Sequence, residues 1–206
     1  GDDIPKHRYF PDAFCDSVFP VQRSLAVNTR PAGKKNIVLF IMESVAYDFF
    51  DSTSSFKVRM PFFDSLVQQS SFYTNAFCYS HDSNKGITDI LAGIPTLTDI
   101  PFYHSQYVNM PVTAIGKAVE KNGYRSLFCI GDAYDNFGFA KCMNWLGIGR
   151  YYSEEAITGY KKLPSHSMGL QDENVLTFFY RKINETEKHF LGIHYNLSNN
   201  YTYDLS

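Results

Sequence analysis

The segment 36–42, Asn-Ile-Val-Leu-Phe-Ile-Met, constrains the fold of this chain more than any other, and it runs directly into an acid, Glu43. A continuous apolar run of this length is typical of a strand buried on both faces, as in a parallel sheet. Open α/β sheets bind their ligands at the carboxyl ends of the strands. The pattern therefore predicts that Glu43 lies at the ligand-binding edge of such a sheet.

A second segment, Ser80 to Ile87, opens a predicted helix and carries Ser83 near its start. The first turn of a helix presents free N–H groups and a positive dipole end, which favour an anion. Taken alone, Ser83 is most simply a helix cap, and Glu43 a solvated acid at a strand end. Together, they are two halves of a metal-assisted phosphotransfer site, because a serine hydroxyl is a poor nucleophile until a metal activates it.

Strand and helix signals alternate along the rest of the chain. Strands are expected near 36–42, 72–78, 125–130 and 190–196, and helices from Met60-Pro61 onward, over 86–91, 112–122, 138–145 and 169–183. This alternation predicts an α/β fold with a mostly parallel sheet and helices on both faces. Residues 1–34 are irregular and rich in proline, which is typical of an N-terminal arm or linker.

Composition excludes several classes of function. A net charge of −2 gives no basic field for nucleic acid, and no apolar run reaches the roughly 18 residues of a membrane span. The four cysteines, Cys15, Cys78, Cys129 and Cys142, include no C-x-x-C pair, so a cysteine zinc site is not expected. Cys78 and Cys129 lie in strand-like runs and are most simply buried thiols, while a disulfide to Cys15 or Cys142 stays open.

The order of several short motifs is more informative than any one of them. They are the strand at 36–44, the helix start at 60–63, the serine segment at 83–95, and the pieces at 123–126, 131–137, 169–173 and 190–198. In this order and spacing, from about residue 34 to the end, they resemble the sulfatase-like branch of the alkaline phosphatase superfamily. The resemblance is greatest to its lipoteichoic-acid-synthase-type phosphoglycerol transferases.

The resemblance implies an alkaline-phosphatase-like or sulfatase-like fold that is incomplete, with residues 35–206 as the N-terminal part of a catalytic domain. It implies that Ser83 is the covalent nucleophile, that Glu43 and Ser83 bind metal, and that the substrate is bound by Lys85, Asp132, Asn136 and Phe137. The residues themselves leave alternatives open. Lys85 is either a point charge for a phosphate or a solvated surface charge, Asp132 either supports a ligand or caps a turn, and Phe137 is equally a packing residue.

The resemblance also implies a divalent metal, Mn, Mg, Zn or Ca, in the full-length protein. The family's other metal ligands lie beyond the segment that ends at Asn200, so residues 1–206 alone are expected to bind the metal weakly or not at all. The implied substrate is a lipid or glycan carrying a phosphate or sulfate ester. The implied setting is extracytoplasmic, in the periplasm or at the cell surface, with a membrane-anchored parent protein.

The sequence departs from the family at several positions. Asp82 stands where Arg or Lys usually precedes the nucleophile, and an anion there is expected to repel a phosphate. Asn84 stands where Asp is common, and Asn200 replaces a histidine that contacts substrate. No C-x-P-x-R or S-x-P-x-R motif surrounds Ser83, which disfavours true sulfatase chemistry. Three functions remain open: a phospho-head-group transferase, a phosphate or sulfate ester hydrolase, and an inactive domain that binds glycan or lipid head groups.

Overall fold

The computed structural model describes residues 8–18, 20, 33–56, 58–159 and 169–199, so Asn200 lies outside the described residues. Contacts divide the chain into two units, Gly1–Lys35 and Asn36–Ser206. The described part of the first unit contains α1 (Asp12–Val18), a helix with no buried residue, where the sequence predicted only irregular chain. The second unit holds the sheet and the candidate site.

The sheet has four strands, β1 (Ile37–Ile41), β2 (Arg125–Ile130), β3 (Arg150–Tyr152) and β4 (Phe190–Tyr195), in the order β1-β4-β2-β3. Each neighbouring pair is parallel. In the register of the three longer strands, His194 of β4 lies between Phe40 of β1 and Cys129 of β2. The predicted parallel sheet is therefore confirmed, and its two central strands come from distant parts of the sequence.

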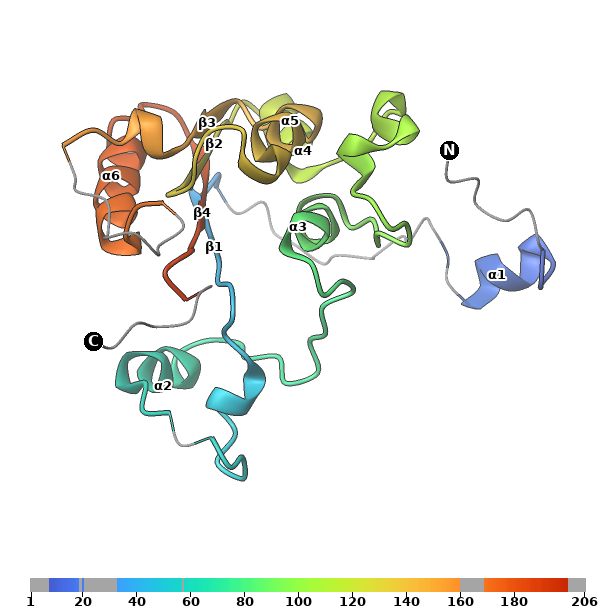
Figure 1. Cartoon of the computed structure of the whole chain (residues 1–206), viewed down its shortest axis with the longest axis horizontal. Helices are drawn as coiled ribbons and strands as arrows, with labels where there is room; N and C mark the ends of the chain where they lie inside the picture. The colour runs from blue at the N-terminus through green and yellow to red at the C-terminus, as the bar shows by residue number, and fades with distance from the viewer. Residues whose placement is uncertain (1–7, 19, 21–32, 57, 160–168, 200–206) are drawn as a thin grey trace. The chain divides into compact units, whose positions relative to one another are not determined.

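Helices cover both faces of the sheet, as the alternating pattern predicted (Figure 1). Helix α3 (Ser83–Ala92), α4 (Ile115–Lys121) and α5 (Phe139–Trp145) pack on one face, and α6 (Asp172–Asn184) packs on the other. Helix α2 (Pro61–Gln68) buries no residue. Short 3-10 helices cover Tyr47–Phe49, Phe102–His104, Gln106–Asn109, Asn136–Gly138 and Glu154–Ala156.

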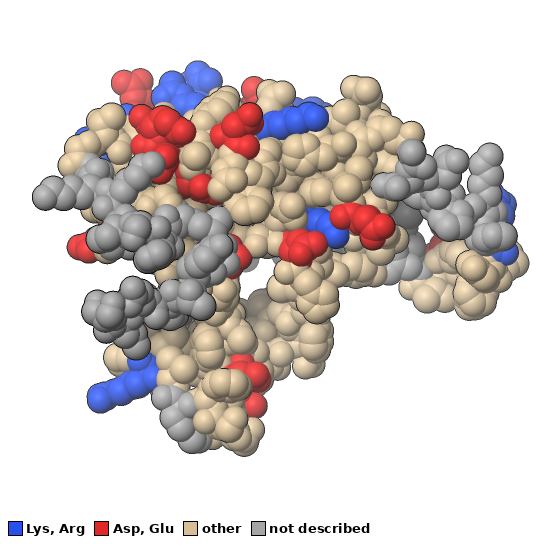
Figure 2. Space-filling model, viewed as in Figure 1, with Lys and Arg blue, Asp and Glu red and all other residues tan. Residues whose placement is uncertain are grey.

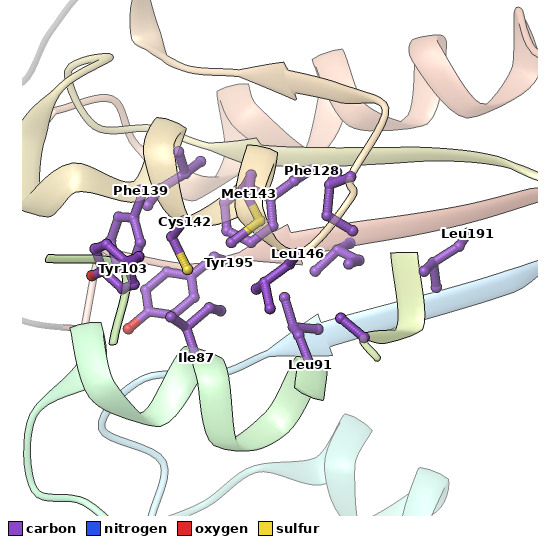
Figure 3. Packing of buried hydrophobic residues seen from close by; sticks show 14 of the residues in the cluster. Ile87, Leu91, Tyr103, Phe128, Phe139, Cys142, Met143, Leu146, Leu191 and Tyr195 are labelled. Carbon is purple, nitrogen blue, oxygen red and sulfur yellow. The ribbon is translucent and has the colours of Figure 1, made fainter. Parts of the chain in front are cut away.

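Alternation along the strands divides the core into two clusters. In β2, Phe128 and Ile130 join the larger cluster with α3, α4 and α5, whereas Leu127 and Cys129 join the smaller one with α6. In the larger cluster, Ile87 and Leu91 of α3 lie against the sheet together with Met143 of α5 (Figure 3). Because α3 is held by this apolar face, its N-terminus has a fixed place beside the carboxyl edge of the sheet.

The start of α6 is tied to the end of β4 by a reciprocal set of hydrogen bonds. The Asp172 carboxylate accepts from the N–H groups of Leu197 and Ser198, at 2.9 and 3.0 Å. In return, the Ser198 hydroxyl accepts from the Asp172 N–H at 2.9 Å. An acid in the first turn also complements the helix dipole. These bonds fix the chain just beyond Tyr195, at the edge where the candidate site lies.

Two sequence-based expectations about strands were wrong. Residues 72–78 form no strand, and their aromatic side chains are exposed, from Phe72 at 41%, which contacts Tyr47 and Phe50, to Phe77 at 89%. No strand among the described residues pairs with this segment. Cys78 is exposed and not buried, whereas Cys129 is buried as expected. The sequence also missed β3, because three residues are too few to show a period. All four cysteines are free thiols in the structure.

His194 gives the fold a predicted pH dependence. Its buried ring lies near Phe40 and Phe179, and neither ring nitrogen has a hydrogen-bond partner among the described residues. Burial lowers the pKa of His194, and the Asp172 carboxylate and the Cys129 backbone oppose this only in part. The unfolded chain, with a histidine pKa of about 6.5, therefore binds the proton more readily than the folded chain does. The free energy of unfolding is expected to fall as the pH drops below that value.

Urea unfolding at a series of pH values from about 7.5 to about 5.5, a range that spans the ordinary histidine titration, measures this effect. The matched variant is His194→Leu, which removes the titrating group and puts an apolar side chain of similar size in its place. Its stability should change less over the same range. A variant that loses stability as steeply as the wild type would show that another group carries the pH dependence.

Candidate active site

Three residues lie at or just beyond the ends of strands that finish at the same edge of the sheet. Glu43 comes two residues after β1, Asp132 comes two residues after β2, and Tyr195 is the last residue of β4, which lies between them. The strands are parallel, so their carboxyl ends meet at one edge, where α/β sheets bind ligands. The sequence singled out Glu43 and Asp132 for this reason and overlooked Tyr195.

Ser83 is the first residue of α3, and its side chain points to Glu43. The Ser83 hydroxyl donates a hydrogen bond to Glu43 Oε1 at 2.8 Å. The N-cap of the helix is Asp82, whose backbone carbonyl accepts from the N–H groups of Lys85 and Gly86. Ser83 is therefore not the helix cap that it would most simply be, and its hydroxyl is available at the positive end of the helix dipole.

The Glu43 carboxylate is held on both of its oxygens. Oε1 accepts from Ser83, and Oε2 accepts from the Tyr195 hydroxyl at 2.6 Å. The backbone N–H of Glu43 donates to the Asn196 side-chain oxygen at 2.5 Å. Burial is the main cause that raises the pKa of Tyr195, the Glu43 carboxylate adds to it, and the Ser83 hydroxyl opposes it. Tyr195 and Asn196 could have been found from the sequence only as residues near the end of an apolar run.

Backbone strain occurs at two places beside these residues. Among the described residues, Ser44 and Phe137 are the non-glycine residues with a positive φ, at 59° and 53°. Ser44 directly follows Glu43, and Phe137 lines the same pocket as Ser83. The buried Tyr103 hydroxyl lies 3.1 Å from the carbonyl oxygens of both Asn84 and Phe137, and so ties the strained turn to the start of α3. Strain of this kind clusters at functional sites.

Glu43 and Ser83 line a cavity of about 450 Å³. Glu43, Ser83 and Asn84 form part of its wall, together with His81 and Asp82. The remaining wall is apolar or aromatic, formed by Phe137, Phe139, Tyr195 and Leu197. A cavity whose wall combines a few polar groups with apolar and aromatic side chains is the usual form of a small-molecule site.

Asp132 and Asn136 lie outside this wall and contact each other. The Asn136 amide donates to both oxygens of Asp132, at 2.9 and 2.8 Å, and Ala133 N–H donates to one of them at 2.8 Å. Asp132 is buried, and its backbone carbonyl also accepts from Glu154 N–H. The pair therefore shapes the turn that leads into Phe137. Of Asp132, Asn136 and Phe137, which were predicted to bind substrate, Phe137 lines the cavity.

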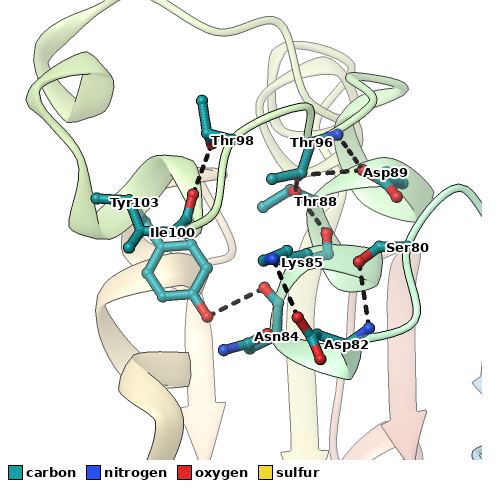
Figure 4. Close-up of polar contacts among 10 residues, drawn as sticks. All are labelled: Ser80, Asp82, Asn84, Lys85, Thr88, Asp89, Thr96, Thr98, Ile100 and Tyr103. Atoms are coloured by element: carbon teal, nitrogen blue, oxygen red, sulfur yellow. Dashed lines mark hydrogen bonds and ion pairs between the residues drawn. The ribbon is translucent and has the colours of Figure 1, made fainter. Parts of the chain in front are cut away.

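Lys85 forms an ion pair with Asp82, the acid that stands where the family usually carries Arg or Lys. Its ammonium group lies 3.0 Å from an Asp82 carboxylate oxygen, and its side chain is 17% exposed against 60% for Asp82 (Figure 4). Lys85 is thus neither a freely solvated charge nor part of the cavity wall. The pair brings a compensating positive charge next to Asp82, which weakens the repulsion that the sequence predicted.

A divalent metal fits these residues as an incomplete site. The Glu43 carboxylate and the Ser83 hydroxyl are hard oxygen ligands that already lie 2.8 Å apart. The side-chain oxygen of Asn84, in the same cavity wall, has no hydrogen-bond partner among the described residues. No group of three or more His, Cys, Asp or Glu side chains gathers there or elsewhere in the described part of the chain. The donor set suits a cation but is small.

A second cavity, of about 320 Å³, lies at the opposite edge of the sheet. Its wall includes Arg125 and Arg150 at the starts of β2 and β3, with Lys182 and Glu185 near the end of α6. Lys182 and Glu185 form an ion pair at 2.7 Å. On the face seen in Figure 2, Lys and Arg lie among Asp and Glu and do not form one basic area. The carboxyl edge, where parallel α/β sheets bind their ligands, is the better candidate for a ligand site.

Comparisons with known proteins point to one family. The family model described as Sulfatase matches residues 35–205, while no curated protein matches the chain. No helix in the described ranges is long and apolar enough to cross a membrane.

Two solved structures have a similar fold. One is a protein in the alkaline phosphatase superfamily from Vibrio parahaemolyticus, with a TM-score of 0.73 and 19% identity, covering 85% of this chain and 43% of that one. The other is the lipoteichoic acid synthase LtaP from Listeria monocytogenes, with a TM-score of 0.67 and 15% identity, covering 80% of this chain and 40% of that one. The present chain therefore spans less than half the length of either protein.

Proposed function

The chain belongs to the sulfatase family, and on that premise we propose that it carries the nucleophile of a metal-dependent phospho-head-group transferase, of the phosphoglycerol type, that acts outside the cytoplasm. The 2.8 Å hydrogen bond from Ser83 to Glu43, inside a cavity at the carboxyl edge of the sheet, is the main support. It brings together a hydroxyl, a carboxylate and a helix N-terminus. Covalent phosphoryl transfer needs all three, to attack, to accept a proton and to hold an anion.

The proposed reaction begins at the Ser83 hydroxyl. Its oxygen forms a bond to phosphorus while the bond from phosphorus to the leaving alkoxide breaks. The serine proton already lies on the hydrogen bond to Glu43 and leaves toward that carboxylate, and the alkoxide takes up a proton from water. An acceptor hydroxyl then attacks phosphorus and gives its proton to the hydroxide that this water left behind. The bond from phosphorus to Ser83 Oγ breaks, the head group leaves as a new ester, and Ser83 takes its proton back from Glu43.

A bound divalent metal would stabilise the serine alkoxide and the charge on the phosphoryl oxygens. Glu43 and Ser83 would hold it, and residues 1–206 alone are expected to bind it weakly because affinity depends on the number of ligands. In this proposal, residues 35–206 are the N-terminal part of a catalytic domain. The membrane-anchored setting of the parent protein rests on the family resemblance.

The substrate class that we propose is a lipid- or glycan-linked phosphate ester. The Listeria structure of similar fold is a lipoteichoic acid synthase, and aromatic rings line the same cavity as Ser83. Phe137 would contact the head group directly, at 48% exposure. Asp132 and Asn136 would act by holding the turn that carries Phe137, and Lys85 by balancing the charge of Asp82.

Trapping of the covalent intermediate tests this function. The protein encoded by the full reading frame is incubated with a short-chain phosphatidylglycerol and MnCl2, quenched in acid and digested. Mass spectrometry should then find a glycerophosphoryl group on the peptide that contains Ser83. Head-group release with no modification of that peptide, or modification of another serine, would contradict the proposal.

Two other functions compete with the transferase. A hydrolase would pass through the same phosphoserine with water as the acceptor, so it is distinguished by the product: free head group instead of a new ester. A catalytically inactive domain that binds glycan or lipid head groups is favoured by Asp82 and by the small set of metal ligands in the described residues. In that case the protein would bind the phospholipid in the trapping experiment without modifying Ser83.

Replacement of Asp82 should strengthen substrate binding. Asp82→Arg restores the cation that the family usually carries and releases Lys85 from its ion pair. We expect the KM for a phosphodiester to fall roughly fivefold, since one charge interaction at about 4 Å in water is worth about 1 kcal/mol. Steady-state kinetics measure this, with Asp82→Asn as the control that removes the anion without adding a cation. A KM in Asp82→Arg equal to or above that of the wild type would contradict a role of this position in substrate binding.

A further inference from the structure

Tyr195 is hydrogen-bonded to the carboxylate that also binds Ser83, although nothing in its sequence setting singled it out. It is the last residue of β4 and is only 3% exposed. Its hydroxyl donates to Glu43 Oε2 at 2.6 Å, while Ser83 donates to the other oxygen of the same carboxylate. The two bonds together fix the rotation of the carboxylate about its own axis.

The rest of Tyr195 is held rigidly. Its ring lies 5.7 Å from that of Phe139 and 6.4 Å from that of Phe128, within the larger core cluster. Its phenolic O–H is a neutral hydrogen-bond donor. Because this donor lies on a strand in the core, it holds the Glu43 carboxylate, on the loop after β1, in one position.

We propose that Tyr195 is a positioning residue, which holds Glu43 Oε2 so that Oε1 faces Ser83 and the entering cation. This inference rests on the proposed function, since it assigns Glu43 and Ser83 to the same reaction. Without the tyrosine hydroxyl, the Glu43 carboxylate would keep its hydrogen bond to Ser83 but would lose the contact that holds Oε2. Groups that orient a metal ligand in this way typically change metal affinity or activity by about 10- to 100-fold when they are removed.

The test is Tyr195→Phe, which removes the hydroxyl and keeps the ring in the core. In the full-length protein, kcat for a phosphodiester in the presence of MnCl2 should fall about 10- to 100-fold, with KM within about twofold of the wild type. The affinity for Mn²⁺, measured by calorimetry without substrate, should fall by a similar factor. The split between kcat and KM, together with the Mn²⁺ affinity, separates positioning from a general loss of stability.

The structure offers a matched control in Tyr151→Phe. Tyr151 also lies against Phe128, with ring centroids 5.8 Å apart, and its buried hydroxyl has no hydrogen-bond partner among the described residues. This variant should keep the wild-type kcat and Mn²⁺ affinity. Tyr195→Phe with unchanged kcat and Mn²⁺ affinity, or an equal loss in both variants, would overturn the inference.

The Mn²⁺ measurement also separates this inference from the proposed function. If the wild type turns over no ester, yet binds Mn²⁺ more tightly than Tyr195→Phe does, the transferase proposal fails and the positioning role of Tyr195 stands. If the wild type neither turns over an ester nor binds Mn²⁺, both fall. If Ser83→Ala abolishes turnover while Tyr195→Phe leaves it intact, with equal Mn²⁺ affinity, the transferase stands and the role of Tyr195 does not.

Discussion

Ser83→Ala is expected to abolish turnover in the full-length protein while leaving the fold intact. The removed hydroxyl is the proposed covalent acceptor, so activity on a phosphodiester should fall by orders of magnitude. Stability should change little, because the hydrogen bond from the side chain to Glu43 contributes about 1 kcal/mol. For a domain of this size, that corresponds to a shift of only a few degrees in Tm. Steady-state kinetics and thermal unfolding on the same preparation separate the two effects.

The control for this prediction is Ser65→Ala. Ser65 lies on α2, is exposed and lines neither of the two cavities described above. It should keep wild-type kinetics, so a loss in Ser83→Ala alone would be specific to the site. Turnover at the wild-type rate in Ser83→Ala would remove the nucleophile from the proposed mechanism, and the head-group-binding domain would then become the leading interpretation.

Of the substitutions proposed in this protein, Ile193→Ala should lower the free energy of unfolding most. Ile193 lies in the middle of β4, is fully buried, and belongs to the core cluster that includes α3 and α5. Truncation of a buried isoleucine to alanine removes apolar contacts and leaves a cavity, at a cost of about 2–5 kcal/mol. Tm should fall by roughly 5 to 15 °C, measured by circular dichroism or calorimetry.

Ile90→Ala makes the same change in side chain at a position that is 53% exposed on α3. Its effect should remain within about 0.5 kcal/mol, as is usual for a surface position. The comparison sets the same truncation at a buried position of a strand against an exposed position of a helix. Equal losses in the two variants would mean that β4 is not the packed centre of the sheet.

The fold class could be predicted because its determinants are local. The apolar segments at 36–42, 125–130 and 190–196 became β1, β2 and β4, and their alternation with helices indicated parallel pairing. The end of α3 could also be predicted from the sequence, since Gly93 adopts the left-handed conformation, φ 66°, that ends a helix. The family resemblance, carried by the order of motifs, is confirmed by the Sulfatase model over residues 35–205.

The errors in the fold have a common physical cause. The segment 72–78 alternates like a strand, but a strand exists only where another strand accepts its hydrogen bonds, and no partner is present there among the described residues. β3 shows the converse: three residues with little pattern of their own form a strand because β2 offers them a free edge. Pairing is a property of two segments, and a local pattern reports only one of them.

The sequence by itself determined the chemistry that is available in this protein: an acid after a buried strand at Glu43, a hydroxyl at a helix start at Ser83, and the order in which they occur. Only the tertiary structure decided which groups meet. It joined Glu43 to Ser83 and Tyr195, paired Asp132 with Asn136 outside the cavity, and set Lys85 against Asp82. Contacts between residues 40 or 152 positions apart depend on how strands and helices pack, because burial of apolar faces, and not local pattern, fixes where the ends of these elements lie.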